Sequence, residues 1–249
     1  MFVSGYVPSP KDPRDWQVRS FWGPSRYPSE YVVPDIEKVP VFDQGPRGTC
    51  VSQASTAMKM WQEMREGTHY LLLSREYLYA RCKLFDGIPS EEGTYPRIAM
   101  DVLTKWGICR ETMLPYFHTP SAVILTPQMD QDAWPNIIVS YARVRSLDAL
   151  KGALMTYGPV VIGVPVYENW ETNDVKITGK IPLPSQVQIG GHAILIYGWN
   201  ETHLLVRNSW GTAWGLKGNG LLPITYPELY EDAWLAIDMV GNTRVRKGS

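Results

Sequence analysis

The fold is decided by the stretch GGHAILIYGWNETHLLVRNSWGTAWG (190–215), which holds two strand-like runs. The first is HAILIYGW (192–199) and the second is HLLVRNSW (203–210). Their aliphatic, β-branched and aromatic residues are the types enriched in strands. Only residues 200–202 separate the two runs, and so short a link favours a hairpin. The stretch therefore predicts two neighbouring antiparallel strands.

More strands and a helix are expected just before this hairpin. Residues 137–144 and 160–166 are short segments rich in β-branched types, which predicts two further strands. Ser146 as a cap and Gly158 as a stop predict a helix over 147–156. The second half of the chain is thus expected to form an antiparallel β lobe.

The first half of the chain reads as helical. Apolar residues recur at helical spacing over 50–65, Ser74 is a plausible cap for a helix over 74–84, and 96–106 predicts a third helix. A helical lobe (41–118) followed by a β lobe (119–249) makes the fold class α+β. A cleft between two such lobes is a common place for a functional site.

Residues 1–40 carry prolines throughout, at positions 8, 10, 13, 24, 28, 34 and 40. Proline lacks an amide donor and disfavours helix in the residue before it. We expect an extended arm laid over the body of the protein, and this arm is a candidate to cover the cleft.

Composition excludes several classes of protein. The formal net charge is −1, without a basic cluster, so neither composition nor charge indicates a nucleic-acid partner. The sequence has no run of about 18 apolar residues, so no membrane span is predicted, and the first residues lack a signal-peptide pattern. The expected location is cytoplasmic, with secretion by another route left open. Three cysteines, Cys50, Cys82 and Cys109, make a disulfide scaffold improbable.

Three residues are candidates for chemistry, although each has an ordinary structural interpretation. Cys50 begins a predicted helix, where unpaired amides and the helix dipole are expected to lower the pKa of its thiol. His192 opens one hairpin strand and Asn208 ends the other, so an asparagine oxygen can orient the imidazole. Taken singly, a buried core cysteine and a histidine satisfied at a strand end are the more common situations.

Taken together, three blocks resemble the papain family of cysteine peptidases: QGPRGTC (44–50), GGHAILIYGW (190–199) and NSWGTAWG (208–215). The arm and the segment LSREYLYAR also resemble a bacterial branch that lacks the long helical propeptide. The resemblance covers about residues 39–240. It implies a two-lobe fold whose β lobe is barrel-like, with the site in the cleft between the lobes.

The resemblance also implies roles for individual residues. Cys50 is the expected nucleophile, His192 the base, Asn208 its orienter and Gln44 an oxyanion donor, with Trp210 in support. The expected reaction is hydrolysis of peptide bonds through an acyl-enzyme, as an endopeptidase, on peptide or protein substrates and without metal or cofactor. A transpeptidase or a catalytically silent peptide-binding module is the alternative.

Departures from the family pattern lie around the cleft. Arg47 stands where the family usually has a disulfide cysteine, and Val51 where a tryptophan usually follows the nucleophile. The paired glycines of the substrate cleft appear as Gly93-Thr94. The expected substrate-binding residues are Gly93, Thr94, Gly191 and Trp214.

Overall fold

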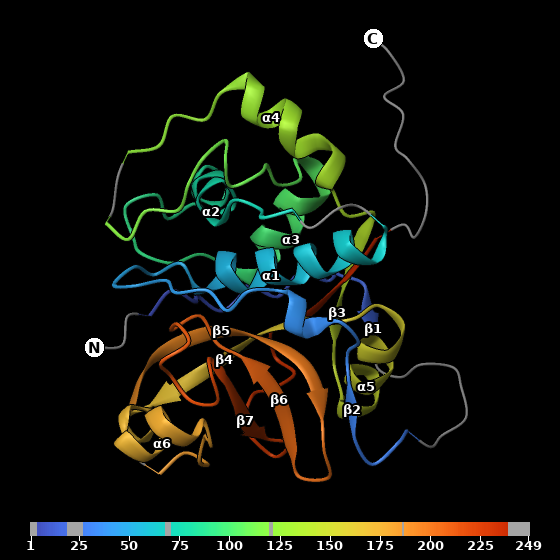
Figure 1. Cartoon of the computed structure of the whole chain (residues 1–249), viewed down its shortest axis with the longest axis vertical. Coiled ribbons are helices and arrows are strands. Elements are labelled where there is room, and N and C mark those ends of the chain that lie inside the picture. The colour runs from blue at the N-terminus through green and yellow to red at the C-terminus, as the bar shows by residue number, and fades with distance from the viewer. Residues whose placement is uncertain (1–3, 19–26, 68–70, 120–121, 186, 239–249) are drawn as a thin grey trace.

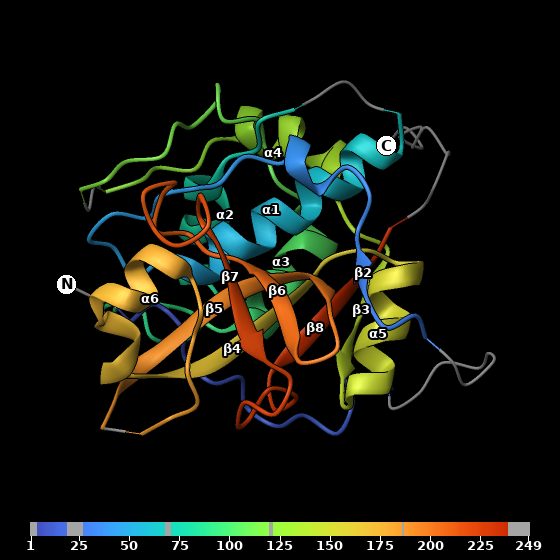
Figure 2. The same cartoon turned by 60° about the horizontal axis from the view of Figure 1, so that its bottom comes forward.

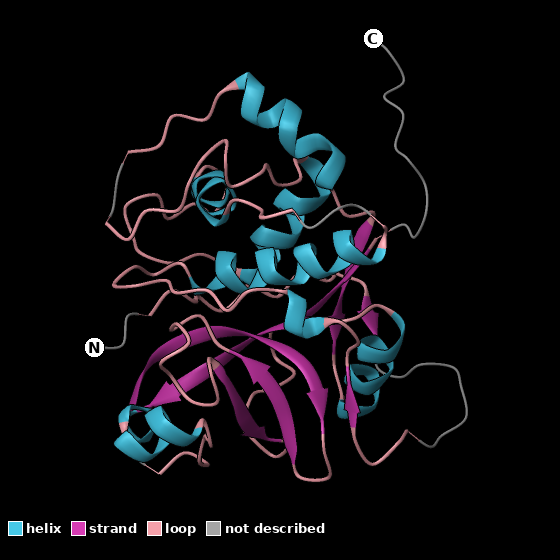
Figure 3. Ribbon diagram, in the orientation of Figure 1, coloured by secondary structure: helices cyan, strands magenta, loops and turns pink. Residues whose placement is uncertain are grey.

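The computed structural model describes residues 4–18, 27–67, 71–119, 122–185 and 187–238. Four helices gather on one side of the molecule and the strands on the other (Figure 1, Figure 3). The helices of this side are α1 (Cys50–Arg65), α2 (Arg75–Lys83), α3 (Pro96–Lys105) and α4 (Pro127–Ala133). The expected α+β two-lobe fold is confirmed.

Helix α1 is the central element of the molecule. Every residue from Cys50 to Glu63 is buried, because α1 contacts α2 and α3 on one side and strands β4 and β5 on the other. A helix that is buried all round lies in a core rather than at a surface. The predicted helices over 50–65, 74–84 and 96–106 are all present. The Ser74 hydroxyl caps α2 by accepting the Tyr77 N–H at 3.0 Å.

The strands form one eight-stranded sheet in the order β1-β3-β8-β4-β5-β6-β7, and β2 pairs with β5 off this path. Their bounds are β1 (Gln17–Val18), β2 (Tyr31–Val32), β3 (Ser140–Val144), β4 (Val160–Tyr167), β5 (Gln188–Trp199), β6 (His203–Arg207), β7 (Asn219–Pro223) and β8 (Ala233–Ile237). The predicted hairpin is β5–β6, and the Asn200 side chain accepts the N–H groups of Thr202 and His203 in its turn.

The barrel-like closure expected for the β lobe is wrong. Closure requires the two end strands of the sheet to pair, whereas among the described strands β1 and β7 remain at opposite ends. Strand β1 comes from the N-terminal arm and runs parallel to β3, so arm residues occupy that side of the sheet. The helices α5 (Leu147–Thr156) and α6 (Asn173–Thr178) lie at opposite ends of this open sheet (Figure 2).

One α-helix follows the predicted lobe boundary at 118/119 before the strands of the β lobe begin. Helix α4, which follows it, packs on the helical side: Asp130 accepts the Tyr77 hydroxyl of α2 at 2.8 Å. The Asn136 amide, just after α4, donates to the carbonyl of Ile108 at 2.8 Å. Helix α4 and Asn136 therefore pack with the helices rather than with the sheet. No apolar periodicity indicated a helix there, because α4 is short and only Ala133 of it is buried.

The N-terminal arm is anchored to both lobes. The buried Asp15 accepts from Arg97 of α3 at 2.7 Å and from Arg143 of β3 at 3.1 Å. In Figure 1 the first described residues run between the helices and the sheet toward β1. Among the described residues, no helix is long and apolar enough to cross a membrane.

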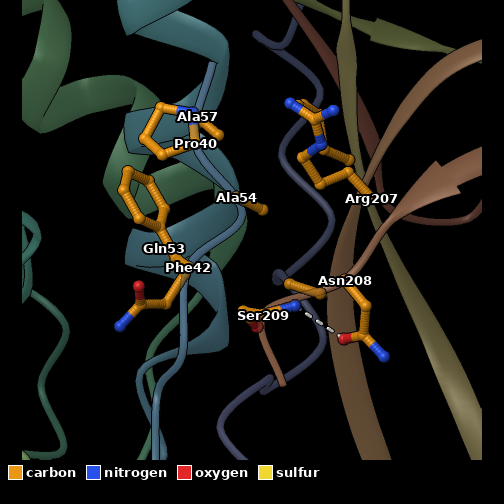
Figure 4. Close-up of a pocket in the computed structure, with 10 residues that line it drawn as sticks. Pro40, Phe42, Gln53, Ala54, Ala57, Arg207, Asn208 and Ser209 are labelled. Atoms are coloured by element: carbon orange, nitrogen blue, oxygen red, sulfur yellow. Dashed lines mark hydrogen bonds between the residues drawn. The ribbon is translucent and has the colours of Figure 1, made fainter. Parts of the chain in front are cut away.

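The interface between the lobes is tightly packed. Figure 4 shows Pro40, Phe42 and α1 side chains facing Arg207, Asn208 and Ser209 across a small internal cavity. The cavity measures about 10 Å³, which is about the space of one water molecule. The end of β6 is therefore held firmly against α1, and Asn208 follows directly.

Candidate active site

Cys50 is the first residue of α1, directly after Thr49 in the N-cap position. Its sulfur accepts the backbone N–H of Ala193 at 3.4 Å, which joins the helical lobe to β5 beside His192. The Gly5 N–H of the arm also hydrogen-bonds to this sulfur. Cys50 and His192 both have 0% of their surface exposed, so neither can meet a substrate in this conformation.

His192 and Asn208 form a directly bonded pair. The distance from His192 Nε2 to Asn208 Oδ1 is 2.7 Å. An amide oxygen only accepts, so Nε2 carries the proton and the neutral ring keeps its basic lone pair on Nδ1. Asn208 Oδ1 also accepts the Ser209 N–H at 2.7 Å (Figure 4). The Trp210 ring stacks on the imidazole with ring centroids 4.6 Å apart and covers it.

Gln44 connects the loop before Cys50 to the loop after β6. Its Oε1 accepts the Ser209 hydroxyl at 2.7 Å, and its Nε2 donates to the Arg47 carbonyl at 2.8 Å. Since a side-chain amide carries two N–H groups, one further donor of Gln44 remains for a ligand. The backbone of Gln44 also donates to the Ser209 carbonyl at 2.8 Å, so the amide is held on both sides.

Burial decides the protonation of the pair in this conformation. It raises the pKa of the Cys50 thiol to about 12, although the N–H groups of Ala193, Gly5, Val51 and Cys50 act to lower it. Burial lowers the pKa of His192 to about 4, although the hydrogen bond that its Nε2–H donates to Asn208 acts to raise it. The N–H groups at the start of α1 thus act in the expected direction, but desolvation outweighs them, and the net pKa of Cys50 in the covered site is raised.

The expected substrate-binding backbone lies against the tip of the arm, which we define as residues 4–7. Thr94 donates its N–H to the Gly5 carbonyl at 3.1 Å and accepts the Val7 N–H at 3.1 Å. The Ser4 hydroxyl donates to the Gly191 carbonyl at 3.0 Å and accepts the Gly191 N–H at 3.1 Å. The tip thus pairs with backbone on both sides of Cys50.

Close packing restricts the tip further. An added Cβ on Gly5 would lie 2.3 Å from the Gly48 carbonyl carbon, and one on Gly93 would lie 2.8 Å from the Gly5 oxygen. Gly93 also has φ 90°, a backbone angle that favours glycine. Trp214, by contrast, is buried against the edge of Trp210, with ring centroids 5.4 Å apart.

For several residues of the site, the sequence did not indicate which contacts they make. The proline pattern of the arm indicated an extended strand but not which of its residues reach the cleft. Ser209 is part of the matched NSWGTAWG block, yet its bond to Gln44 depends on tertiary contact. Arg47 was noted as a departure, and the structure places it in a buried ion pair with Glu76.

Three carboxylates form a cluster whose geometry could hold a metal ion. Glu63, Glu66 and Asp238 bring their oxygens within 4.8 Å of one another. Glu63 lies on α1 more than three helical turns from Cys50. The Lys59 ammonium is ion-paired with Glu63 and with Asp238, so a cation already compensates this cluster.

A thiol at a helix N-terminus, beside a strand that carries an imidazole held by an amide, defines the class of cysteine peptidases. The model of the papain family cysteine proteases matches residues 34–223, more than half of the chain, and the chain belongs to this family. It is accordingly a hydrolase of the cysteine peptidase type, as the resemblance implied.

Known relatives agree with this assignment. Xylellain, a cysteine protease from Xylella fastidiosa, is similar in structure, with a TM-score of 0.87 and 28% identity over 95% of this chain and 96% of that chain. The uncharacterized peptidase C1-like protein L477 of Acanthamoeba polyphaga mimivirus is 28% identical over 78% of this chain and 68% of its own length. The cathepsin B-like cysteine proteinase 5 of Caenorhabditis elegans is 32% identical, but only 34% of its length is matched.

Proposed function

We propose that the chain is a cysteine endopeptidase in which Cys50 is the nucleophile, His192 the general base and acid, and Asn208 the residue that orients the imidazole. The observation that carries the proposal is the short contact between His192 and Asn208 beside a thiol at the start of α1. Gln44 is the proposed side-chain donor to the oxyanion, together with the backbone N–H of Cys50.

The proposed reaction has two stages. His192 Nδ1 takes the thiol proton, and the thiolate attacks the peptide carbonyl to give a tetrahedral oxyanion held by Gln44 Nε2 and the Cys50 N–H. The C–N bond then breaks, His192 gives its proton to the leaving amine, and a thioester remains. In the second stage His192 takes a proton from water, which attacks the thioester and releases the acid and the thiol.

The course of the arm supports an endopeptidase. The chain passes Cys50 at Gly5, pairs with Thr94 and continues to the exposed Pro8. In an exopeptidase, a loop or another segment of the protein closes one end of the cleft. Here the end of the cleft beside Thr94 is open, because the arm itself passes through it as a continuous chain. A substrate can therefore extend beyond the site on this side.

We further propose that the tip keeps the full chain latent. It covers both reacting side chains and favours the neutral thiol and imidazole over the ion pair. The tip also presents the Gly5 N–H, and not a carbonyl carbon, to the sulfur. The thiolate attacks carbonyl carbons, so it has no bond to cleave at this position of the tip. The tip runs parallel to the segment around Thr94. A substrate must place a carbonyl carbon at the sulfur instead, so the tip blocks the site without being cleaved there.

Alkylation of the full chain tests the proposal. Iodoacetamide at pH 6 to 8 should label Cys50 slowly in the natural sequence and much faster in Gly5→Val, since the added side chain would overlap the Gly48 backbone. Lys11→Ala, a change at an exposed arm residue outside the cleft, is the matched control and should label slowly.

Activity provides the second readout. Gly5→Val should cleave internal bonds of a denatured protein, and Gly5→Val/Cys50→Ser should not, while Gly5→Val/Cys82→Ser retains cleavage. Mass spectrometry of the products separates hydrolysis from ligation. If residues are lost only from the ends of the substrate, the proposed endopeptidase activity is wrong. If cleavage survives Cys50→Ser, Cys50 is not the nucleophile.

A further inference from the structure

The side chain of Tyr6, in the arm tip, fills a pocket beside Cys50. Two glycines make room for it: an added Cβ would lie 2.1 Å from the Tyr6 ring at Gly163 and 2.5 Å from it at Gly191. Gly163 lies on β4 and pairs with Ala193 of β5, so this wall is rigid sheet backbone. Any larger residue at either position would take up the volume of an aromatic ring.

The far end of this pocket is polar. The Tyr6 hydroxyl donates to the Asp232 carboxylate, which is only 2% exposed. Asp232 also accepts the Trp234 indole N–H at 2.6 Å and the Ser9 N–H at 2.7 Å. Burial, followed by the charge of Asp232, raises the pKa of Tyr6, so its hydroxyl stays a donor. An aromatic ring ending in a hydroxyl thus matches both the shape and the bonding of the pocket.

Resting on the proposed peptidase function, we infer that this pocket is the specificity pocket of the enzyme and binds a tyrosine side chain of the substrate, whose hydroxyl Asp232 recognises. Tyr6 of the tip then occupies the place of that substrate tyrosine. Gly5 faces the sulfur and Tyr6 is its neighbour, so one residue should separate the substrate tyrosine from the cleaved bond.

The charges around Asp232 favour a hydroxyl over a cation. Arg143 Nη1 lies 4.0 Å from Asp232 Oδ1, and this guanidinium is itself buried, with its Nε bonded to Asp15. A lysine or arginine in the pocket would add a second buried cation beside Arg143, which carries a desolvation cost. A phenylalanine would fit by shape but would leave a buried carboxylate oxygen without the donor that Tyr6 supplies.

A set of internally quenched peptides that differ at one position tests the inference. That position carries tyrosine, phenylalanine, O-methyltyrosine, lysine or alanine. The enzyme is the full chain with Gly5→Val, which displaces the tip, and Tyr6→Ala, which removes the ring that fills the pocket. O-methyltyrosine keeps the ring and removes only the donor. Mass spectrometry locates each cleaved bond, and thermal unfolding verifies that each variant is folded.

The expected kcat/KM for the tyrosine peptide exceeds that for phenylalanine and for O-methyltyrosine by about 5- to 100-fold, the effect of one unsatisfied buried acceptor. In Asp232→Asn, the Trp234 N–H takes the remaining oxygen, so the ratio of tyrosine to phenylalanine should fall toward one. The neighbouring change Glu231→Gln, at an exposed carboxylate, is the matched control and should keep the ratio.

A second variant tests the shape of the pocket. Gly163→Ala places a methyl group where the ring lies. It should reduce the ratio of tyrosine to alanine cleavage by about 10-fold or more, as overpacking does.

The outcomes separate this inference from the proposed function. Two results would contradict the inferred tyrosine pocket while the proposed peptidase function is retained. One is Cys50-dependent cleavage that prefers lysine or phenylalanine, and the other is a tyrosine preference that Asp232→Asn leaves unchanged. Absence of cleavage of every peptide by folded Gly5→Val/Tyr6→Ala, with Cys50 no more reactive than Cys82, overturns the proposed function itself.

Discussion

The guanidinium of Arg47 is buried between the loop that precedes Cys50 and helix α2. It is ion-paired with Glu76 through both terminal nitrogens, with Nη2 to Oε1 at 3.0 Å, and donates to the Phe117 carbonyl at 2.6 Å. The ring centroids of Tyr79 and Tyr116 lie 5.5 Å and 5.2 Å from the guanidinium carbon. Arg47 thus joins three segments at the position where the family resemblance places a disulfide cysteine.

We predict that Glu76→Gln destabilises the protein strongly. It leaves the charge of Arg47, whose side chain is 4% exposed, without its counter-ion, and breaking a buried pair in this way costs about 3–5 kcal/mol. At about 2–4 °C per kcal/mol for a chain of this size, the Tm should fall by roughly 6–20 °C. Thermal unfolding followed by circular dichroism measures this change.

The control is an ion pair in solvent. Asp35→Asn removes the partner of Lys38, and these side chains are 52% and 60% exposed, so the cost should stay below about 1 kcal/mol. The double change Arg47→Met/Glu76→Leu removes both buried charges and should recover much of the stability lost in Glu76→Gln. Reductant should not alter the Tm, because Cys50, Cys82 and Cys109 are free thiols.

The same bond network predicts an effect on catalysis. The Arg47 carbonyl accepts from Gln44 Nε2, so displacing Arg47 should also displace the proposed oxyanion donor and lower kcat. If Glu76→Gln shifts the Tm no further than Asp35→Asn does, the buried pair is not an important constraint, and the argument from charge burial fails.

Four further predictions follow from single residues. Asn208→Ala should lower kcat by about 10²-fold, since it frees the imidazole that must transfer protons; equal kcat in steady-state assays would refute the orienting role. Gln44→Ala should lower kcat by about 10²–10³ while KM changes little, and a pure KM effect would contradict the oxyanion assignment. The unfolded chain protonates His192 near pH 6.5, but the covered site does so only near pH 4. The free energy of unfolding should therefore decrease as the pH is lowered from about 6.5 to about 4, and it should decrease less in His192→Gln. Gly158→Ala should lower the Tm by several degrees, because φ is 95° and the new Cβ would lie 1.9 Å from Trp61; an unchanged Tm would show that the turn relaxes.

The elements with a strong local pattern were predictable. Helix α1 has apolar residues at helical spacing, α2 and α5 have serine caps, and β5–β6 has a short link between two strand-like runs. Helices α4 and α6 were not predicted, because they are short and each has a single buried residue. Strands β1 and β2 have two residues each, too few for a period-2 pattern to be read.

The proposed catalytic residues were recognisable only as a set. Cys50, His192 and Asn208 each had a plausible structural interpretation, and the three family blocks made the common assignment. Their protonation in the covered state was not predictable, because desolvation depends on which residues surround the thiol in three dimensions. The helix terminus was visible in the sequence, and the arm was a candidate to cover the cleft, but the sequence did not show which arm residues lie against Cys50.

The sequence by itself determined the family, the α+β class and the identity of the proposed catalytic residues, because these depend on local periodicity and on short motifs. Only the tertiary structure placed Gly5 against Cys50, Tyr6 between Gly163 and Gly191, and Asp232 at the end of that pocket. These contacts join residues that are far apart in the chain. They depend on the close approach of glycine backbone to other groups and on one hydrogen bond between the Tyr6 hydroxyl and the Asp232 carboxylate. No periodicity records such a contact, since its free energy depends on the folded surroundings of each group.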